Sequence, residues 1–415
     1  MAENPRTPAQ LIVELERELA RRATAGLVRR RRILQSPQGP RVDVDGRSIL
    51  SFASNDYLGL ANEPRVVAAV QAGLGAHGVG AGASALVAGH FAPHEELERA
   101  LAAFVVPGGV GRVLTFSTGY LANLAILTAL ARRGDAIFAD RLNHACLNDG
   151  ALLARADFVR YPHVDVAALA RALAKSAARR KIIATDAVFS MDGTIAPLPE
   201  LLALAERFDA LLVIDDAHGF GVLGDGRGSA AHCGIASDRL VIMGTLGKAA
   251  GVAGAFVAAH PAIVETLMQS ARSYVYTTAA PPALAVGLLA SLEAIIAGGT
   301  RRAHLDDLIT RLRAGTRDLP WYWGDSCTAI QPLIVGDNGS AVRLADALWD
   351  RGLWVPAIRP PTVPVGTARL RVSLSAGHSL ADVDRLVEAL AALGALADGR
   401  AASAASAMMA GGAGP

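Results

Sequence analysis

Short β-branched runs alternate with longer helical patterns through most of this chain, from about residue 65 to residue 330. Helical patterns at 165–178 and 197–208 separate several of these runs. Alternation of this kind predicts parallel strands joined by right-handed crossovers, with helices on both faces of one sheet. We predict strands at 112–116, 135–138, 181–184, 211–214 and 240–243.

The two ends of the chain follow other patterns. Residues 8–32 predict an amphipathic helix, because apolar side chains recur at helical spacing from Leu11 to Leu19. Beyond residue 328 the pattern predicts strands at 329–335, 353–357 and 369–374 and helices at 340–351 and 379–395. We therefore expect an N-terminal helical segment at 1–48, a large α/β domain at 49–290, a small α+β domain at 291–396 and a disordered tail at 397–415.

Composition and charge exclude several classes of protein. Hydrophobic residues make up 52% and charged residues 19% of the 415 residues, which is typical of a well-packed globular protein. The net charge of +2 gives no electrostatic reason to expect nucleic acid or a membrane surface as a partner. No run approaches the roughly 18 apolar residues of a membrane-spanning helix, and residues 1–10 contain no signal-peptide core. We expect a cytoplasmic protein, and the spacing of its cysteines predicts no metal site.

Polar residues follow the predicted strands at the point where each strand ends. In open parallel sheets, ligands bind beyond the carboxyl ends of the strands. The sequence therefore places a candidate site at this edge of the sheet, built from residues 117–119, 140–144, 186–192, 215–218 and 245–248.

The last of these segments contains a lysine, Lys248, in a chain whose 40 basic residues are nearly all arginine. An amine can lose its proton and attack a carbonyl, whereas a guanidinium effectively cannot. A phosphate-binding P-loop would need glycine at position 242 and a hydroxyl residue at position 249, but Ile242 and Ala249 stand there. The sequence therefore favours a lysine that forms a Schiff base.

A second glycine motif, GFGVLG at 219–224, matches the pattern of dinucleotide-binding loops. The residues that follow it, DGRGS, are poor helix formers, so the strand–loop–helix context of that motif is missing. An oxidoreductase that uses NAD stays only a distant alternative.

Asp215, His218 and Lys248 together match what pyridoxal phosphate (PLP) requires, although an isolated aspartate at a strand end is usually a turn or cap residue. This cofactor needs a lysine that forms an imine and a carboxylate that keeps its pyridine nitrogen protonated. Thr118 and Gly119 precede a helix-forming run, and amides at a helix start bind phosphate. His144 could stack on the pyridine ring, or be an ordinary hydrogen-bonded histidine.

In combination these segments resemble the fold-type I PLP-dependent enzymes, and within them the α-oxoamine synthases, over about residues 10–395. The matching segments are 54–59 (SNDYLG), 140–145 (DRLNHA), 188–193 (VFSMDG), 215–219 (DDAHG) and 244–248 (GTLGK). The resemblance implies an aspartate aminotransferase-like fold, with a large, mostly parallel seven-stranded sheet flanked by helices and a small C-terminal α+β domain. Segment 357–371 is similar to the biotin-pathway members of this family.

The resemblance also implies roles for individual residues. Lys248 would form the Schiff base and act as the base at Cα, Asp215 would pair with the pyridine nitrogen, and His144 would stack on the ring. His218 and Ser190 would bind the phenolic oxygen of the cofactor. The phosphate ligands would be Thr118, Gly119, Tyr120 and Thr245, with Thr278 reaching in from a second subunit of a homodimer whose sites lie at the interface.

For the substrates, the resemblance implies L-alanine and a pimeloyl thioester, either pimeloyl-CoA or pimeloyl-acyl carrier protein, joined with loss of CO2. Arg371, helped by Asn55, would bind the carboxylate of the amino acid. Arg359 would meet the far carboxylate of the pimeloyl chain, with Arg30 and Thr362 as further substrate-binding candidates. The alternatives are another α-oxoamine synthase (glycine C-acetyltransferase, 5-aminolevulinate synthase or a serine palmitoyltransferase-like enzyme), and a PLP aminotransferase or lyase.

The chain departs from the family pattern at two places. Asp186 stands where relatives usually have glutamate, and the glycine-rich segment 78–85 lacks the arginine that many relatives place after its serine. Neither change touches the residues expected around the Schiff base, but both could alter how the acyl chain enters.

Overall fold

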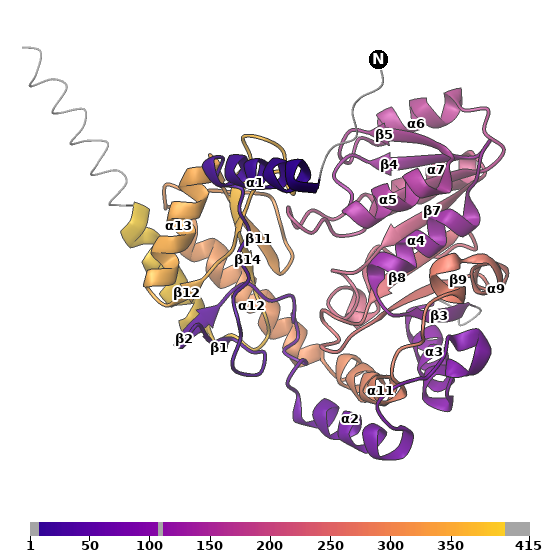
Figure 1. The fold of residues 1–415 in the computed structure, drawn as a ribbon, viewed down its shortest axis with the longest axis horizontal. Coiled ribbons are helices and arrows are strands. Elements are labelled where there is room, and N and C mark those ends of the chain that lie inside the picture. The colour runs from indigo at the N-terminus through magenta and orange to yellow at the C-terminus, as the bar shows by residue number, and fades with distance from the viewer. Residues whose placement is uncertain (1–7, 107–110, 395–415) are drawn as a thin grey trace, which may run out of the picture.

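The computed structural model describes residues 8–106 and 111–394, which form a large and a small lobe (Figure 1). The large lobe is built on a seven-stranded sheet, and the small lobe on a three-stranded and a four-stranded sheet. The predicted disordered tail, 397–415, lies outside the described residues.

The large sheet is mostly parallel. Its strands are β3 (Arg112–Phe116), β4 (Ala136–Asp140), β5 (Asp157–Tyr161), β6 (Lys181–Asp186), β7 (Ala210–Asp215), β8 (Leu240–Thr245) and β9 (Ala255–Ala259). They lie in the order β3-β9-β8-β7-β6-β4-β5, and only β9 runs antiparallel to its neighbours. The predicted fold class is therefore confirmed. Strands β5 and β9 were not predicted, because β5 is a half-exposed edge strand and β9 is rich in alanine.

Helices cover both faces of this sheet, each contributing an apolar stripe. On one face lie α4 (Gly119–Leu130), α5 (Ala145–Ala154), α9 (Pro261–Ser270) and α10 (Arg272–Val275). On the other lie α3 (Ala92–Val105), α6 (Val166–Lys175), α7 (Leu198–Arg207) and α11 (Pro282–Ile296). The remaining helical elements of this lobe are α2 (Pro64–His77), η1 (Ala85–Gly89), η3 (Gly224–Gly226) and α8 (Ser229–His232).

The small lobe joins the C-terminal region to residues near the N-terminus. Its three-stranded sheet has the order β1-β2-β12, and its four-stranded sheet the order β10-β11-β14-β13. These strands are β1 (Arg41–Val44), β2 (Arg47–Ser51), β10 (Tyr322–Trp323), β11 (Ile330–Gly336), β12 (Leu353–Trp354), β13 (Ala357–Ile358) and β14 (Ala368–Ser373). The helices are α12 (Gly299–Thr316), α13 (Asn338–Asp350) and one described over 380–394.

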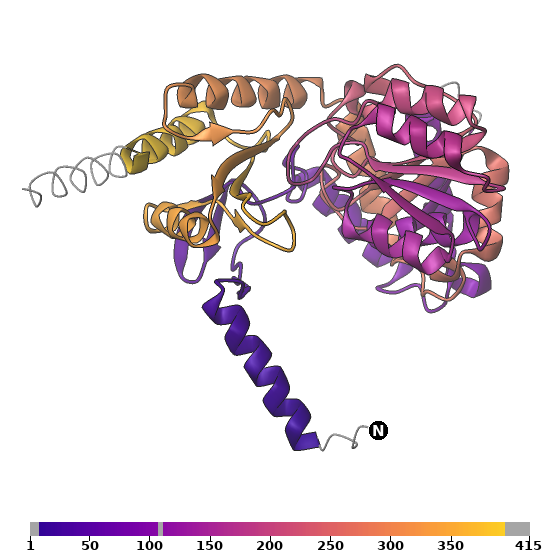
Figure 2. The same cartoon turned by 90° about the horizontal axis from the view of Figure 1, so that it is seen from above.

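The N-terminal helix α1 (Pro8–Thr24) is shorter than the sequence predicts. It was expected to continue to residue 32, but Gly26 adopts φ 66°, a left-handed conformation that ends helices. Figure 2 shows α1, in indigo, projecting from the small lobe. Leu11, Ile12 and Leu19 on this helix are exposed.

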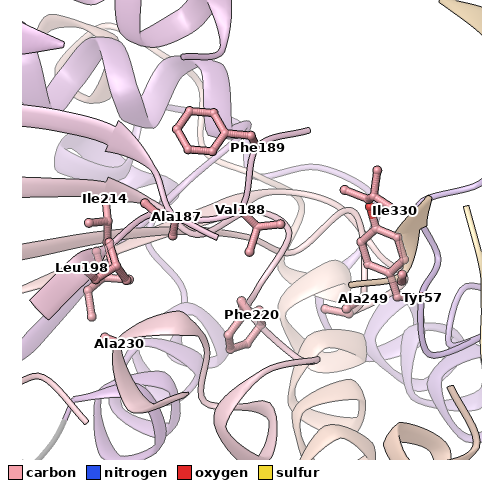
Figure 3. Packing of buried hydrophobic residues seen from close by; sticks show 14 of the residues in the cluster. Tyr57, Ala187, Val188, Phe189, Leu198, Ile214, Phe220, Ala230, Ala249 and Ile330 are labelled. Atoms are coloured by element: carbon pink, nitrogen blue, oxygen red, sulfur yellow. The ribbon is translucent and has the colours of Figure 1, made fainter. Parts of the chain in front are cut away.

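A single hydrophobic cluster continues from the large sheet into the small lobe. Figure 3 shows Leu198 and Ile214 toward one end of this cluster and Tyr57, Ala249 and Ile330 toward the other. Because Ile330 belongs to β11 and Ala249 follows Lys248, packing fixes the Lys248 loop against the small lobe.

Within residues 8–106 and 111–394, no single helix has the length and apolar composition needed to cross a bilayer. Helices α11 and α12 meet that requirement only as a pair, and they are bent by 67° relative to each other.

Candidate active site

A cavity of about 200 Å³ lies at the carboxyl ends of β6, β7 and β8. This is the edge of the sheet at which the sequence places a ligand site. The cavity is lined by Gly119, Tyr120, His144, Cys146, Asp186, Ser190, Asp215, Ala217, His218, Met243, Thr245 and Lys248.

Asp215 is the last residue of β7 and is buried. Its Oδ1 accepts a hydrogen bond from the Ala217 backbone N–H at 3.0 Å, and its Oδ2 accepts one from Asn123 Nδ2 at 2.7 Å. The Cys146 thiol also lies 3.9 Å from Oδ2, so the protein holds both oxygens and fixes the plane of the carboxylate.

Lys248 lies in the loop after β8, with its Nζ 2.9 Å from His218 Nε2. Burial lowers the pKa of the Lys248 ammonium below its usual value, and the nearby charge of Asp215 opposes that shift. The loop passes very close to the backbone of residues 60 and 61. A Cβ added at Gly251 would lie 2.4 Å from the Leu60 carbonyl carbon and the Ala61 nitrogen. Glycine at position 251, with φ 70°, is therefore required by this close approach.

His218 lies between Lys248 and Tyr57 and contacts both. Its Nδ1 lies 2.6 Å from Tyr57 Oη, while its Nε2 faces Lys248. Burial, and then the positive charge of Lys248, lowers the pKa of His218 well below its usual value. The imidazole is therefore neutral at neutral pH, with one nitrogen available as donor and the other as acceptor.

His144 caps the start of α5 beneath the same cavity. Its Nδ1 accepts from the Cys146 backbone N–H at 3.4 Å and lies 2.8 Å from Cys146 Sγ. Its own backbone N–H donates to both carboxylate oxygens of Asp186, at 3.1 and 3.2 Å. Burial, and then the charge of Asp215, raises the pKa of Asp186 well above its usual value. Asp186 thus anchors the turn that carries the His144 ring.

Three of the residues predicted to hold phosphate, Thr118, Gly119 and Tyr120, lie at the start of α4, and Thr245 ends β8. Thr118 Oγ1 accepts from the Leu121 backbone N–H at 3.2 Å and so caps this helix. Gly119, Tyr120 and Thr245 line the cavity, whereas Thr118 does not. Tyr120 donates its hydroxyl proton to Asp149, and Thr245 Oγ1 donates to the Gly254 carbonyl at 3.2 Å.

Arg371 enters the same network from β14. This buried guanidinium donates to the Ser190 carbonyl at 2.6 Å, to Asn55 Oδ1 at 3.0 Å and to Tyr57 Oη at 3.3 Å. Among the described residues, no carboxylate forms an ion pair with Arg371. A buried cation without an acidic partner favours binding of a carboxylate ligand.

The remaining predicted residues lie outside this cavity. Arg359 donates to the Gly26 and Val28 carbonyls, and Thr362 Oγ1 accepts from Arg29 at 3.2 Å. Arg30 and Arg359 line a different cavity, of about 790 Å³, with three further arginines, Arg31, Arg32 and Arg343. Thr278 is exposed and forms a β-bridge with Ser84, at the end of the glycine-rich segment 78–85.

Sequence reasoning missed Tyr57, Asn123 and Cys146, each of which contacts a predicted site residue. Tyr57 belongs to segment 54–59, which supports the family resemblance, but the sequence predicts no role for this tyrosine itself. Asn123 is a fully buried amide among the apolar residues of helix α4, a polar residue that packing does not require.

The side chains around the smaller cavity fit PLP. They supply a primary amine, a fixed carboxylate, an imidazole neighbour and a helix start that can face a phosphate. PLP is therefore the cofactor that this donor set matches.

The chain matches the family model "aminotransferase class I and II" over residues 47–390. It is 60% identical over 381 residues to the 8-amino-7-oxononanoate synthase of Aromatoleum aromaticum, covering 92% of this chain and 98% of that relative. A serine palmitoyltransferase structure from S. paucimobilis with a bound PLP–myriocin aldimine has a TM-score of 0.87 at 28% identity, covering 94% of this chain and 99% of that one. An 8-amino-7-oxononanoate synthase structure from Francisella tularensis has a TM-score of 0.71 at 31% identity, covering 83% and 97%. The chain belongs to the 8-amino-7-oxononanoate synthase family of PLP-dependent enzymes.

Proposed function

We propose that this chain joins L-alanine to a pimeloyl thioester, with loss of CO2, and releases 8-amino-7-oxononanoate and the free thiol. The acyl carrier is either coenzyme A or an acyl carrier protein. The observation that carries the amino-acid half is the continuous network from Lys248 through His218 and Tyr57 to Arg371. It joins a candidate base to a candidate carboxylate receptor. The acyl half rests on the 60% identity to a chain named for this product.

Lys248 is the proposed base. When bound, PLP supplies an electron sink that stabilises negative charge at the amino-acid Cα. Nζ of Lys248 then takes the Cα proton, and burial assists this step because it lowers the pKa of the ammonium. His218 Nε2 holds Nζ in position at 2.9 Å.

In this proposal Asp215 would pair with the pyridine nitrogen of PLP. Its two oxygens are held by different donors, Ala217 N–H and Asn123 Nδ2, so the carboxylate needs no rearrangement between steps. His144 is held from below by the Asp186 turn, which supports a fixed ring orientation.

Arg371 and Asn55 are the proposed receptor for the alanine carboxylate. Arg371 Nη2 has two N–H groups, and one of them donates to Tyr57. The Oδ1 of Asn55 accepts from both Arg371 and Tyr57, which leaves its Nδ2 without a partner among the described residues. The second Nη2 proton and Asn55 Nδ2 are thus available to two carboxylate oxygens.

The acyl chain is proposed to bind at the cavity of about 790 Å³ that is lined by arginines. Arg359, with Arg30 and Thr362 near it, is proposed to bind the far carboxylate of the pimeloyl group. Arg359 is held by carbonyls of the segment that follows α1, so acyl binding would involve this segment as well.

A homodimer with active sites at its interface is part of the proposal. Thr278 is exposed and lies outside the PLP cavity of its own chain, as expected for a residue that serves a second subunit. The exposed apolar residues of α1 would be covered by the same partner.

The structural likeness to serine palmitoyltransferases supplies the main rival, an enzyme with another amino acid and acyl chain. The experiment offers L-alanine, glycine and L-serine against pimeloyl, acetyl, succinyl and palmitoyl thioesters, and measures release of thiol. We expect L-alanine with the pimeloyl thioester to give the highest kcat/KM. A preference for L-serine with the palmitoyl thioester, or for glycine with acetyl-CoA, would contradict the proposal.

A further inference from the structure

Asn123 is a buried amide on the inner face of α4 whose own role has so far been described only as one of the donors to Asp215. One N–H of Nδ2 donates to Asp215 Oδ2 at 2.7 Å, and Nδ2 also lies 3.1 Å from Cys146 Sγ. The side chain is 0% exposed, and its Oδ1 has no hydrogen-bond partner among the described residues. Because a buried acceptor without a partner destabilises the folded state, packing alone does not explain an asparagine here.

We propose that Asn123 is a positioning residue that fixes the Asp215 carboxylate and the His144 ring for the cofactor. The inference rests on the proposed pairing of Asp215 with the PLP pyridine nitrogen. It concerns cofactor binding rather than the choice of substrates.

The geometry supports this role in two ways. Asp215 Oδ1 is held by a backbone N–H of its own loop. Oδ2 accepts from Asn123 Nδ2 at 2.7 Å and has a longer contact of 3.9 Å with Cys146 Sγ, so Asn123 supplies the shorter side-chain bond that sets the rotation of the carboxylate. Without that bond the carboxylate could rotate about Cβ–Cγ. The carboxylate lone pairs of Asp215 that face the cavity would then no longer point in one fixed direction toward the cofactor.

The second contact of the Asn123 amide, with Cys146 Sγ, links Asn123 to His144. Burial raises the pKa of the Cys146 thiol, which therefore keeps its proton. The thiol has two possible acceptors, His144 Nδ1 at 2.8 Å and Asp215 Oδ2 at 3.9 Å, and the nearer one, Nδ1, also accepts from the Cys146 backbone N–H. The proton of the neutral imidazole then sits on Nε2. Through Asn123, the thiol that contacts His144 and the carboxylate of Asp215 share one anchor on α4.

The test uses Asn123→Leu, which keeps the number and branching of side-chain heavy atoms but removes both polar groups, and measures two properties of the full chain. We expect the PLP dissociation constant, measured by absorbance titration of the cofactor-free protein, to rise roughly tenfold to a hundredfold, since a hydrogen bond to a charged group is lost. The Tm of the cofactor-free protein should change little, because removal of the unpaired Oδ1 offsets the lost hydrogen bond to Asp215. A lowered Tm with an unchanged PLP dissociation constant would mean a structural role only and would overturn the proposal.

Two further variants keep the result decisive. Asn123→Ala removes the same donor if the leucine variant does not fold, and the same rise in the PLP dissociation constant is expected. Thr128→Val is the matched control, because it replaces a polar side chain on α4 that bonds only the Leu124 carbonyl. It should bind PLP as the wild type does. If the wild type itself bound no PLP, the proposed function would fail. If it bound PLP and both Asn123 variants bound it equally well, only the role of Asn123 would fail.

Discussion

Lys248 Nζ and His218 Nε2 lie 2.9 Å apart, and His218 Nδ1 lies 2.6 Å from Tyr57 Oη. The hydroxyl of Tyr57 donates onward to Asn55 Oδ1 at 3.1 Å. The neutral imidazole can therefore accept from Lys248 at Nε2 and donate to Tyr57 from Nδ1. This directed chain links the proposed base to the residues proposed to receive the substrate carboxylate.

Replacing Lys248 by alanine should remove the visible absorbance of enzyme-bound PLP, because the amine that forms the Schiff base is gone. Absorbance spectra of purified wild type and Lys248→Ala, each mixed with PLP, check this. Lys181→Arg is the control, since Lys181 is one of only three lysines and lies at the far end of β6. A band of wild-type intensity in Lys248→Ala would contradict the assignment.

Much of this site could be predicted because parallel strands bring their carboxyl ends to one edge. Asp215 and Lys248 belong to neighbouring strand ends, and their residue types limit the chemistry to a few cofactors. Tyr57 was missed because it precedes the sheet in sequence and reaches His218 only through tertiary packing, with Leu60 and Ala61 against Gly251. Such close approaches leave no local pattern in the sequence.

Asn123 and the end of α1 were missed for related reasons. In the sequence, Asn123 only lowers the helix propensity of its segment, and its role becomes visible only through its tertiary contact with Asp215. The helix pattern at 8–32 contains apolar and charged residues throughout, and one left-handed glycine, Gly26, ends it early. Periodicity predicts the type of an element better than its last residue.

Arg371→Lys should raise the KM for L-alanine more than the KM for the acyl thioester. Lysine keeps the positive charge but loses the planar fork that contacts Ser190, Asn55 and Tyr57. We expect a rise of roughly tenfold to a hundredfold in the KM for L-alanine. Steady-state kinetics with each substrate varied in turn provide the measurement. Arg351→Lys, at an exposed arginine, should leave both constants unchanged. Equal increases in both constants for Arg371→Lys would argue against a carboxylate receptor.

The stability of the cofactor-free protein should depend on pH through Asp216. Burial raises the pKa of this carboxyl from 3.8 to about 7, although hydrogen bonds from Ser229 oppose the shift. Between those two values the folded state holds a proton that the unfolded state has lost. The contribution of Asp216 to the free energy of unfolding is therefore fully present below the lower value and is lost as pH rises to about 7.

Denaturant unfolding of wild type and Asp216→Asn, from about pH 5 to about pH 8, measures this contribution. The difference in free energy of unfolding, wild type minus variant, should fall as pH rises and level off above about pH 7. A difference that stays constant over this range would show that Asp216 titrates normally.

Thr278 should act on the cofactor of the partner subunit. In a mixed dimer of Lys248→Ala and Thr278→Ala chains, one site would then carry both changes and the other site neither. Such a mixture should be more active than the mean of the two parent proteins. If Thr278 served its own chain, every site in the mixed dimer would carry one change, and no activity would be recovered. Sedimentation analysis of the wild type should give the mass of a dimer.

The most direct test of the proposed reaction follows the carboxyl carbon of L-alanine. Wild-type enzyme is supplied with PLP, carboxyl-labelled L-alanine and a pimeloyl thioester, and labelled CO2, free thiol and product are measured together. The account predicts one labelled CO2 for each thiol released, unlabelled 8-amino-7-oxononanoate as the product, and no turnover by Lys248→Ala. Label retained in the product, or thiol release without CO2, would contradict it.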